Sequence, residues 1–332
     1  MDLPTVWFLL IAVLFTGYFI LEGFDFGVGM LLPVLGRDDR ERRVLINTIG
    51  PVWDGNEVWL ITAAGGLFAA FPGWYASLFS GFYLPFLLVL LALIFRGVAF
   101  EYRHKRPDAR WKARWDAAIF LGSLIPAAIW GIVLGNLLRG VPLDAHHDYT
   151  GGLLDLLNPY ALLGGATTTA LFVTHGAVFL ALKTTGDIRA RAGRLAARSA
   201  LATTLATGAF LAVGLTIRNT PAAVALAVAA AVALAGMLAA TRVRREGWAF
   251  VGTAAAIGLT VATLFAALFP TVLPSTTDPA GTLTVANAAS SPYTLKVMTW
   301  VAAFFTPVVL AYQGWTYWVF RKRIGVANIP HP

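Results

Sequence analysis

Nine stretches of the chain are apolar enough and long enough to cross a lipid bilayer as helices. They lie near residues 5–30, 52–70, 75–96, 117–138, 159–182, 199–217, 221–240, 249–269 and 297–320. A helix needs about 20 mostly apolar residues to cross the hydrocarbon core. The seventh stretch is rich in alanine, which drives insertion weakly, so eight spans is the alternative count. The sequence therefore predicts an all-α polytopic membrane protein whose residues 1–332 form one integral membrane domain.

Composition excludes a soluble fold and several kinds of metal site. The side chains are 58% hydrophobic and only 13% charged, and the mean hydropathy is +0.71. An ordinary soluble domain has about 25% charged residues. The chain has no cysteine, which excludes disulfides, thiolate metal sites, iron–sulfur clusters and covalently attached haem on this chain.

The positive charges predict the orientation in the membrane. Of the 25 lysines and arginines, 22 fall in alternate loops, at 37–43, 96–114, 183–198, 242–245 and 321–323. By the positive-inside rule these loops face the cytoplasm, which places the amino terminus outside and the carboxyl terminus inside. The net charge of +8 is therefore a topology signal, and no nucleic-acid partner is expected. Residues 101–116 mix arginine, lysine and tryptophan, which predicts either a cytoplasmic interfacial segment or a plain solvated loop.

Four acids lie within the first two apolar stretches. Glu22 and Asp25 stand three residues apart in the first, and Asp54 and Glu57 have the same spacing in the second, so each pair shares one helix face. A charged acid at the bilayer centre costs about 2.5–3.5 kcal/mol, so all four must face protein or water, carry protons, or pair with a cation such as Arg96.

Three interpretations of these acids stay open at this point. They are buried structural partners of Arg96, Asn56 and backbone amides, or a proton entry path from the cytoplasm, or the cation site of a transporter. Their clustering favours the proton path. Histidine offers little for haem, because only His175 of the five histidines lies in an apolar stretch, and a satisfied core histidine is the simpler interpretation.

Several long motifs resemble subunit II of the cytochrome bd-type quinol oxidases. They are the segments 23–30 (GFDFGVGM), 50–61 (GPVWDGNEVWLI), 135–138 (GNLL), 297–300 (VMTW) and 313–320 (QGWTYWVF). The resemblance extends over the whole chain. It implies a bacterial inner-membrane heterodimer in which subunit I carries the b and d haems and the quinol site, while subunit II binds no haem. That complex oxidises quinol from the quinol pool and reduces dioxygen to water.

The resemblance also assigns roles to single residues. Asp54 matches the proton-pathway aspartate of the family, and Trp59 matches a tryptophan near an oxygen tunnel in some members. Asp25 is expected to be an inner neighbour of Asp54, and Glu22 to help shape the hydrated entry. Relatives can carry glutamine in place of Glu57 or of His175, which argues against a titrating role for Glu57 and for a structural role of His175. The resemblance further implies small accessory subunits and a structural quinone in some members.

Two other functions remain as alternatives. One is an ion-coupled secondary transporter, which would use the same acids but for which no repeated pair of broken helices is seen. The other is a purely structural scaffold subunit, surrounded by lipid and contributing no proton path. The excess of arginine over lysine and the abundance of alanine suggest a GC-rich bacterial genome and, with it, menaquinol as the electron donor.

Overall fold

The computed structural model describes residues 1–329 and is almost entirely helical, which confirms the all-α prediction. Within these residues, eight helices are long and apolar enough to cross a membrane. They are α1 (Leu3–Leu35), α5 (Tyr83–Tyr102) with the 3₁₀ turn η1 (Arg103–Lys105), α6 (Ala109–Arg139), α7 (Pro159–Lys183), α8 (Gly186–Ile217), α9 (Pro221–Arg242), α10 (Glu246–Leu268) and α12 (Pro292–Val319).

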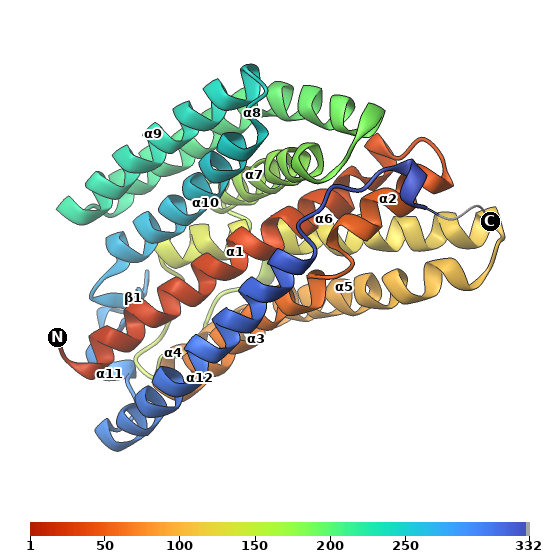
Figure 1. The fold of residues 1–332 in the computed structure, drawn as a ribbon. Helices are drawn as coiled ribbons and strands as arrows, with labels where there is room; N and C mark the ends of the chain where they lie inside the picture. Colours follow the sequence, from red (N-terminus) through yellow and green to blue (C-terminus); the bar gives the residue numbers. More distant parts are fainter. Residues whose placement is uncertain (330–332) are drawn as a thin grey trace.

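The helix that falls short of this criterion is α3 (Trp53–Ala70), not the alanine-rich α9. The most apolar 18 residues of α9 have a mean hydropathy of 2.4, the highest value among the eight helices, whereas α3 carries Asp54, Asn56 and Glu57 near its start. Alanine was therefore the wrong reason for expecting eight helices. In Figure 1, α3 lies behind α12 and runs alongside it. Whether α3 crosses the membrane stays a prediction.

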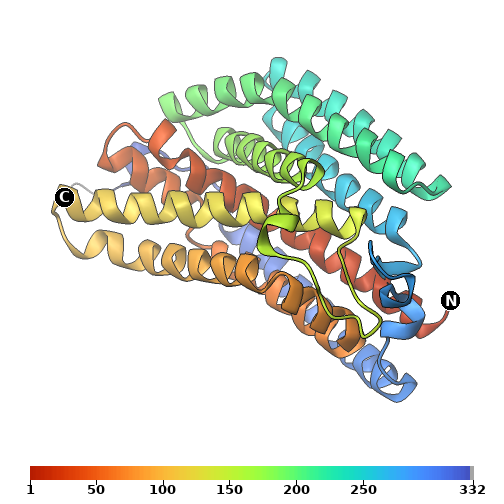
Figure 2. The same ribbon diagram turned by 180° about the vertical axis from the view of Figure 1, so that it is seen from behind.

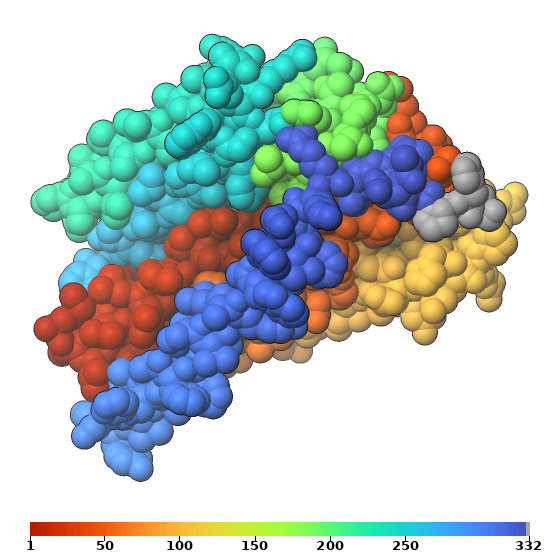
Figure 3. Space-filling view, in the orientation of Figure 1, coloured from red at the N-terminus to blue at the C-terminus, as the bar shows by residue number. Residues whose placement is uncertain are grey.

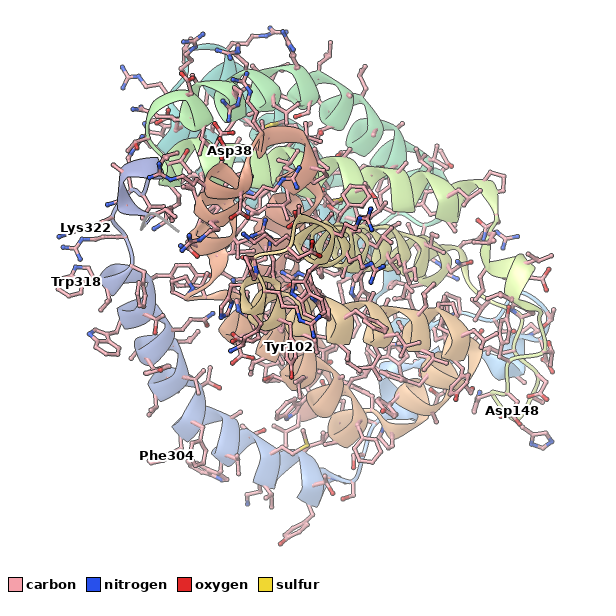
Figure 4. All side chains as sticks on the ribbon, turned by 90° about the vertical axis from the view of Figure 1, so that its right-hand side faces the viewer. Asp38, Tyr102, Asp148, Phe304, Trp318 and Lys322 are labelled. Atoms are coloured by element: carbon pink, nitrogen blue, oxygen red, sulfur yellow. The ribbon has the colours of Figure 1, made fainter. Side chains whose placement is uncertain are left out.

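The five basic segments meet at one end of the bundle, here called the basic end (Figure 1). The ion pairs that join them there include Arg191 to Glu41 at 2.6 Å, Lys112 to Asp39 at 2.8 Å, and Arg189 to Glu246 at 2.7 Å. Figure 4 views this end, with nitrogen-tipped side chains crowded around Asp38 and Tyr102. Alternate loops thus lie together, as the charge pattern requires, while the side of the membrane that they face stays a prediction.

The opposite end of the bundle holds the irregular connections. The loop over 140–158, with η2 (Leu153–Leu156), packs beside a short antiparallel pair of strands, β1 (Thr271–Leu273) and β2 (Leu283–Thr284), with η3 (Pro279–Gly281) between them. The short helix α11 (Val285–Ala288) follows, and the Ser290 amide donates to the Ala70 carbonyl at 2.8 Å. These bonds tie the ends of α3 and α10 to the start of α12.

Helix α1 is the centre of the structure, covered by α7 and α10 on one side and by α3 and α6 on the others (Figures 1 and 2). Every residue from 22 to 32 is buried, so this third of α1 has no face left for lipid. Glycine permits the close packing: a Cβ on Gly27 would stand 2.0 Å from the Phe172 carbonyl oxygen and 2.7 Å from the Gly176 Cα. Small residues thus let α1 and α7 touch backbone to backbone.

Several helix ends differ from the apolar stretches. Helices α6 and α8 begin at Ala109 and Gly186, well before the expected spans. The expected spans begin too late because the first turns of these helices are charged, and a search for apolar stretches omits charged turns. The expected span 75–96 is broken at Phe82 into α4 (Pro72–Gly81) and α5. Pro85 explains the break, since proline lacks the N–H that a continuous helix needs.

Two segments at the basic end have their own structure. Helix α2 (Asp39–Ile49) is amphipathic and buries Val44, Leu45 and Ile49. Residues 101–116 do not form a helix of their own: they contain the end of α5, the turn η1 and the first residues of α6. Whether they lie at the membrane interface stays a prediction. After α12, the chain returns past α2 through the turn η4 (Val326–Asn328).

Candidate functional site

A buried arginine joins two of the four acids. The Arg96 guanidinium on α5 donates from one nitrogen, Nη1, to Glu22 on α1 and to Glu57 on α3, the latter at 2.8 Å. The side chains of Arg96 and Glu22 are fully buried, and that of Glu57 is 20% exposed. The rings of Phe26 and Phe100 lie 5.0 and 5.2 Å from the guanidinium carbon. Apolar rings therefore surround a charge that is shared by three helices.

Asp25 lies in the same buried region but has an amide as its partner. Asn56 Nδ2 donates to Asp25 Oδ2 at 2.6 Å, and Asn56 Oδ1 accepts from the Tyr317 hydroxyl at 2.7 Å. Gln313 Nε2 donates to the same Asn56 oxygen at 3.3 Å. This chain of hydrogen bonds links α1, α3 and α12. We call Glu22, Asp25, Asn56, Glu57 and Arg96 the acid cluster.

Trp59 lies one turn beyond the acid cluster, at the contact of α3 with α1 and α12. Its indole N–H donates to Gln313 Oε1 at 2.8 Å. A Cβ on Gly17 would stand 2.2 Å from the indole ring, so the ring packs directly on the α1 backbone. These contacts are structural, and a role of Trp59 in an oxygen route stays a prediction.

Asp54 is separate from the other three acids. It is exposed, on the side of α3 that turns away from α1, while Asn56 on the same helix is buried. Within residues 1–329, no donor hydrogen bond or ion pair to its carboxylate is found. The structure therefore brings Glu22, Asp25 and Glu57 together around Arg96 and leaves Asp54 on the outer surface, one turn from Glu57.

The acid cluster contains polar atoms with no partner inside the described part of the chain. These buried atoms are Glu22 Oε2, Asp25 Oδ1, and Arg96 Nε and Nη2. Buried polar groups in proteins are almost always hydrogen-bonded, to protein or to water. Glu22 and Glu57 also share one guanidinium nitrogen, and Asp25 has only the neutral Asn56 amide as its hydrogen-bond donor. The arrangement can therefore hold protons, since a carboxyl oxygen without a donor is free to carry one.

His175 does not fit the role of a haem ligand. It is fully buried, and both ring nitrogens are hydrogen-bonded, Nδ1 to Thr253 Oγ1 at 2.6 Å and Nε2 to the Ile20 carbonyl at 3.1 Å. Its ring also stacks on Phe250 with centroids 4.8 Å apart. In residues 1–329, no three histidine or acidic side chains lie together in a way that could hold a metal ion.

Sequence reasoning missed the partners that α12 supplies. Gln313 and Tyr317 stand four residues apart, on one face of an otherwise apolar helix, and this spacing was the available signal. It also missed a second charged site at the basic end. There the buried Asp116 carboxylate accepts from Arg103 at 2.5 Å and from Arg42 at 2.8 Å.

Asp39 extends this second charged site towards solvent. Burial alone would raise the pKa of Asp39, but the Lys112 hydrogen bond and the charge of Arg103 outweigh it, so the pKa lies below its ordinary value. Arg103 Nη2 is 2.9 Å from Asp39 Oδ1. These pairs fasten α2 to the junction between α5 and α6.

Comparison with known proteins gives a consistent result. The sequence profile described as cytochrome bd terminal oxidase subunit II matches residues 3–320. The chain is 46% identical to the cytochrome bd ubiquinol oxidase subunit 2 of Bacillus subtilis, covering 97% of each chain. It is 39% identical to the cytochrome bd-I ubiquinol oxidase subunit 2 of Escherichia coli, covering 98% of this chain and 96% of the relative.

A solved structure shares the fold. A chain from the bd oxidase of Geobacillus thermodenitrificans superimposes with a TM-score of 0.77 at 20% identity, covering 97% of this chain and 98% of that one. The sequence matches extend over nearly the full length of both partners, at identities well above those of chance similarity. The chain therefore belongs to the cytochrome bd terminal oxidase subunit II family.

Proposed function

We propose that this chain is the non-haem subunit of a quinol-oxidising, oxygen-reducing complex, in which it braces the haem-bearing subunit I and passes protons to it. The observation that carries this proposal is the placement of Asp54. It is an exposed acid within a helix, and it stands one turn from Glu57, which is ion-paired to the buried Arg96. The haems are assigned to subunit I, because both ring nitrogens of His175, the histidine buried among the apolar helices, are hydrogen-bonded. The quinol site is assigned to subunit I because the family resemblance implies it.

The face that would meet subunit I is the outer surface of α3, α5 and α12, here called the docking face. Only 6% of the most apolar part of α12 is buried and 22% of that of α5, against 72% for α7. Figure 3 shows α12 lying along the outside of the molecule. The exposed side chains of α12 include many large aromatic residues, namely Tyr293, Trp300, Phe304, Phe305, Tyr312, Trp315 and Trp318.

Protein fits the docking face better than lipid does. Asp54 is exposed there, and a charged acid facing lipid at the bilayer centre costs about 2.5–3.5 kcal/mol. Gly55, Gly65 and Gly314 are also exposed, and a Cβ on any of them would meet nothing within 4 Å. Small residues on an exposed helix face allow another helix to approach closely.

The proton route proposed here leads from the basic end through the acid cluster to the docking face. Asp25 and Glu22 each keep one carboxyl oxygen without a donor in residues 1–329, so each has a position for a proton. Glu57 connects this buried pair to Asp54, which lies three residues away on α3. Arg96 holds the cluster in place, and Asn56 orients Asp25.

The test is substitution of Asp54 in the assembled oxidase. Asp54→Asn removes the proton-carrying group and keeps the shape, so quinol-driven oxygen consumption should fall while haem content stays normal. Asp54→Glu should retain activity, and Asp187→Asn, at an exposed acid on α8, is the matched control. Wild-type turnover of Asp54→Asn with normal haem would refute the route. Loss of haem in that variant would make Asp54 a structural residue of the docking face.

The scaffold alternative makes a different prediction. If the chain only supports subunit I, replacing Glu22, Asp25, Asp54 and Glu57 by amides should leave turnover per haem unchanged. If the acids conduct protons, this variant should lose turnover at least as fully as Asp54→Asn. Measuring turnover per haem, instead of per milligram, separates lost conduction from lost assembly.

A further inference from the structure

A cavity opens at the basic end between α7, α8, α9 and α10. Its volume is about 280 Å³, and its walls include Gly193 and Ala196 of α8, Ala240 of α9 and Ala249 of α10. Small side chains thus form the inner wall. A Cβ on Gly193 would meet nothing within 4 Å, which shows that the helix backbone itself faces open space. A second, shallower cavity adjoins it, sharing Arg244 and Glu246 and reaching Trp248.

Arginines surround the mouth of this cavity. Glu246 accepts from Arg189 at 2.7 and 2.9 Å and from Arg323 at 2.9 Å, so it organises two of them. Arg244 and Arg245 line the cavities, and neither guanidinium has a hydrogen-bond partner in residues 1–329. Four arginines against one glutamate give a net charge of +3.

The backbone directs one of these arginines to the cavity. Arg244 has φ +55°, a left-handed backbone conformation that residues other than glycine, asparagine and aspartate seldom adopt. The tight turn between α9 and α10 therefore presents Arg244 at the edge of both cavities. Two unpaired guanidinium groups above an apolar wall suit a phosphate, which arginine binds with two parallel hydrogen bonds.

The residues around the cavity favour a lipid over a soluble anion as the ligand. Trp248 is 69% exposed on the first turn of α10, and Val243 and Val251 beside it are 69% and 55% exposed. Tryptophan at the end of a membrane helix marks the level of the lipid headgroups. Basic pockets between membrane helices on the cytoplasmic side are a known setting for anionic headgroups. The apolar wall and the exposed valines offer a path for acyl chains.

We infer that this cavity binds the headgroup of an anionic phospholipid, with Arg244 and Arg245 on the phosphate and the glycerol and upper acyl chains against Gly193 and Ala249. The site is independent of the proton route, since none of its residues belongs to the acid cluster or to the docking face. Its volume of about 280 Å³ lies just below the usual range for ligand pockets. The cavity therefore fits the headgroup and the upper part of the acyl chains and leaves the rest of the chains outside, along α9 and α10.

The test uses the whole oxidase complex in nanodiscs of phosphatidylcholine, alone or mixed with phosphatidylglycerol or cardiolipin. Lipid retained on the complex is counted by native mass spectrometry after mild release. Arg244→Gln removes one phosphate contact, and Gly193→Leu fills the cavity from a position with open space. The matched controls are Arg194→Gln, an exposed arginine of α8 outside the cavity, and Gly208→Leu, a glycine of α8 that also has open space.

The wild type should retain anionic lipid in preference to phosphatidylcholine. Loss of one arginine near the membrane surface should weaken retention about five-fold, and Gly193→Leu should abolish it, while both controls match the wild type. Haem content shows that each variant is assembled. Equal retention by Arg244→Gln and Arg194→Gln would overturn the proposal. So would displacement of the lipid by inorganic phosphate, which would make this a soluble anion site.

Discussion

Arg96 Nη1 donates to Glu57 Oε1 across 2.8 Å, so a cation buried in α5 holds the start of α3 against the bundle. The same nitrogen donates to Glu22 on α1, and the aromatic rings of Phe26 and Phe100 cover the guanidinium. Removing one partner of a buried ion pair leaves the other charge uncompensated. This loss of stability is much larger than that caused by replacing both partners with apolar residues.

Arg96→Gln should therefore destabilise the subunit by about 3–5 kcal/mol. Thermal unfolding of the purified complex, together with haem content, measures this loss. The double variant Glu22→Gln/Arg96→Gln should recover part of the stability, because it removes a buried acid along with the cation. An unchanged unfolding temperature for Arg96→Gln alone would show that the ion pairs do not hold the helices together.

The Tyr317 hydroxyl should contribute less to the stability of the subunit than Arg96 does. It donates to Asn56 Oδ1 at 2.7 Å, and Asn56 in turn donates to Asp25. Tyr317→Phe removes this one donor and should cost about 1 kcal/mol, while Gln313 still donates to the same oxygen. Differential scanning of the complex measures the change. A loss as large as that of Arg96→Gln would contradict the view that Gln313 keeps Asn56 oriented.

The sequence was sufficient to predict an all-α fold and the long apolar helices, but not the short helices α2 and α4 or the break at Phe82. Apolar length and loop charge depend on local composition, so a single chain carries that information. The partners of the acids are harder to predict from the sequence, because they lie far away along the chain. Asn56, which binds Asp25, is hydrogen-bonded to Tyr317, 261 positions away. Arg96 was foreseen as an ion-pair partner because it is a cation at the end of an apolar stretch, and such a charge needs compensation.

Asp54 shows the limit of the spacing argument. The i, i+3 spacing places Asp54 and Glu57 on one side of α3, but one side covers a wide arc of the helix. Within that arc Asp54 is exposed to the outside of the bundle, whereas Glu57 is partly buried. Which part of that arc is buried depends on where α1 and α12 pack. The same kind of tertiary contact decides that α3 is a helix in spite of its low hydropathy, because Asn56 and Glu57 find partners inside the protein.

Low pH should weaken the charged site that Asp39 forms at the basic end. The lowered pKa of Asp39 means that its ion pairs add stability above the pKa of the unfolded state, about 3.9, and that this stability is lost as the pH falls through the folded-state pKa. Asp39→Asn should thus be less stable than the wild type at neutral pH, and the two should converge below about pH 3.9. The effect should be modest, because the Asp39 side chain is 38% exposed.

Unfolding temperatures across the acid range measure this convergence. Lys112→Gln removes one of the two ion pairs of Asp39 and leaves the pair with Arg103, so it should reproduce part of the neutral-pH loss. A constant gap between Asp39→Asn and the wild type at every pH would mean that the aspartate acts through its shape and not through its charge.

The contact between α1 and α7 should tolerate no added methyl group. In Gly27→Ala, the new Cβ would lie 2.0 Å from the Phe172 carbonyl oxygen, which is backbone and cannot rotate away. We expect a loss of about 1–3 kcal/mol or more. Gly208→Ala, at an exposed site on α8 with nothing within 4 Å, should be neutral or slightly stabilising. Equal expression and stability of the two variants would argue against the close α1–α7 packing.

The absence of cysteine gives a direct test of topology, because a single introduced cysteine is the only thiol on the chain. Lys322 belongs to the basic segment 321–323, and Asp148 lies in the loop over 140–158 at the opposite end of the bundle. Positive-inside orientation predicts that a membrane-impermeant thiol reagent labels Asp148→Cys in intact cells and Lys322→Cys only in inverted vesicles. The reverse pattern would invert the predicted orientation and make the basic end an outer surface.

The same labelling decides whether α3 crosses the membrane. Arg37→Cys and Ala76→Cys are exposed and lie before and after α3. If α3 spans the bilayer, Arg37→Cys reacts from the cytoplasmic side and Ala76→Cys from the outside, which gives nine crossings with the amino terminus outside. If both react from the same side, α3 does not cross. The eight helices of sufficient hydropathy would then be the full set of spans, and the positive loops would no longer alternate in the order that the charge pattern requires.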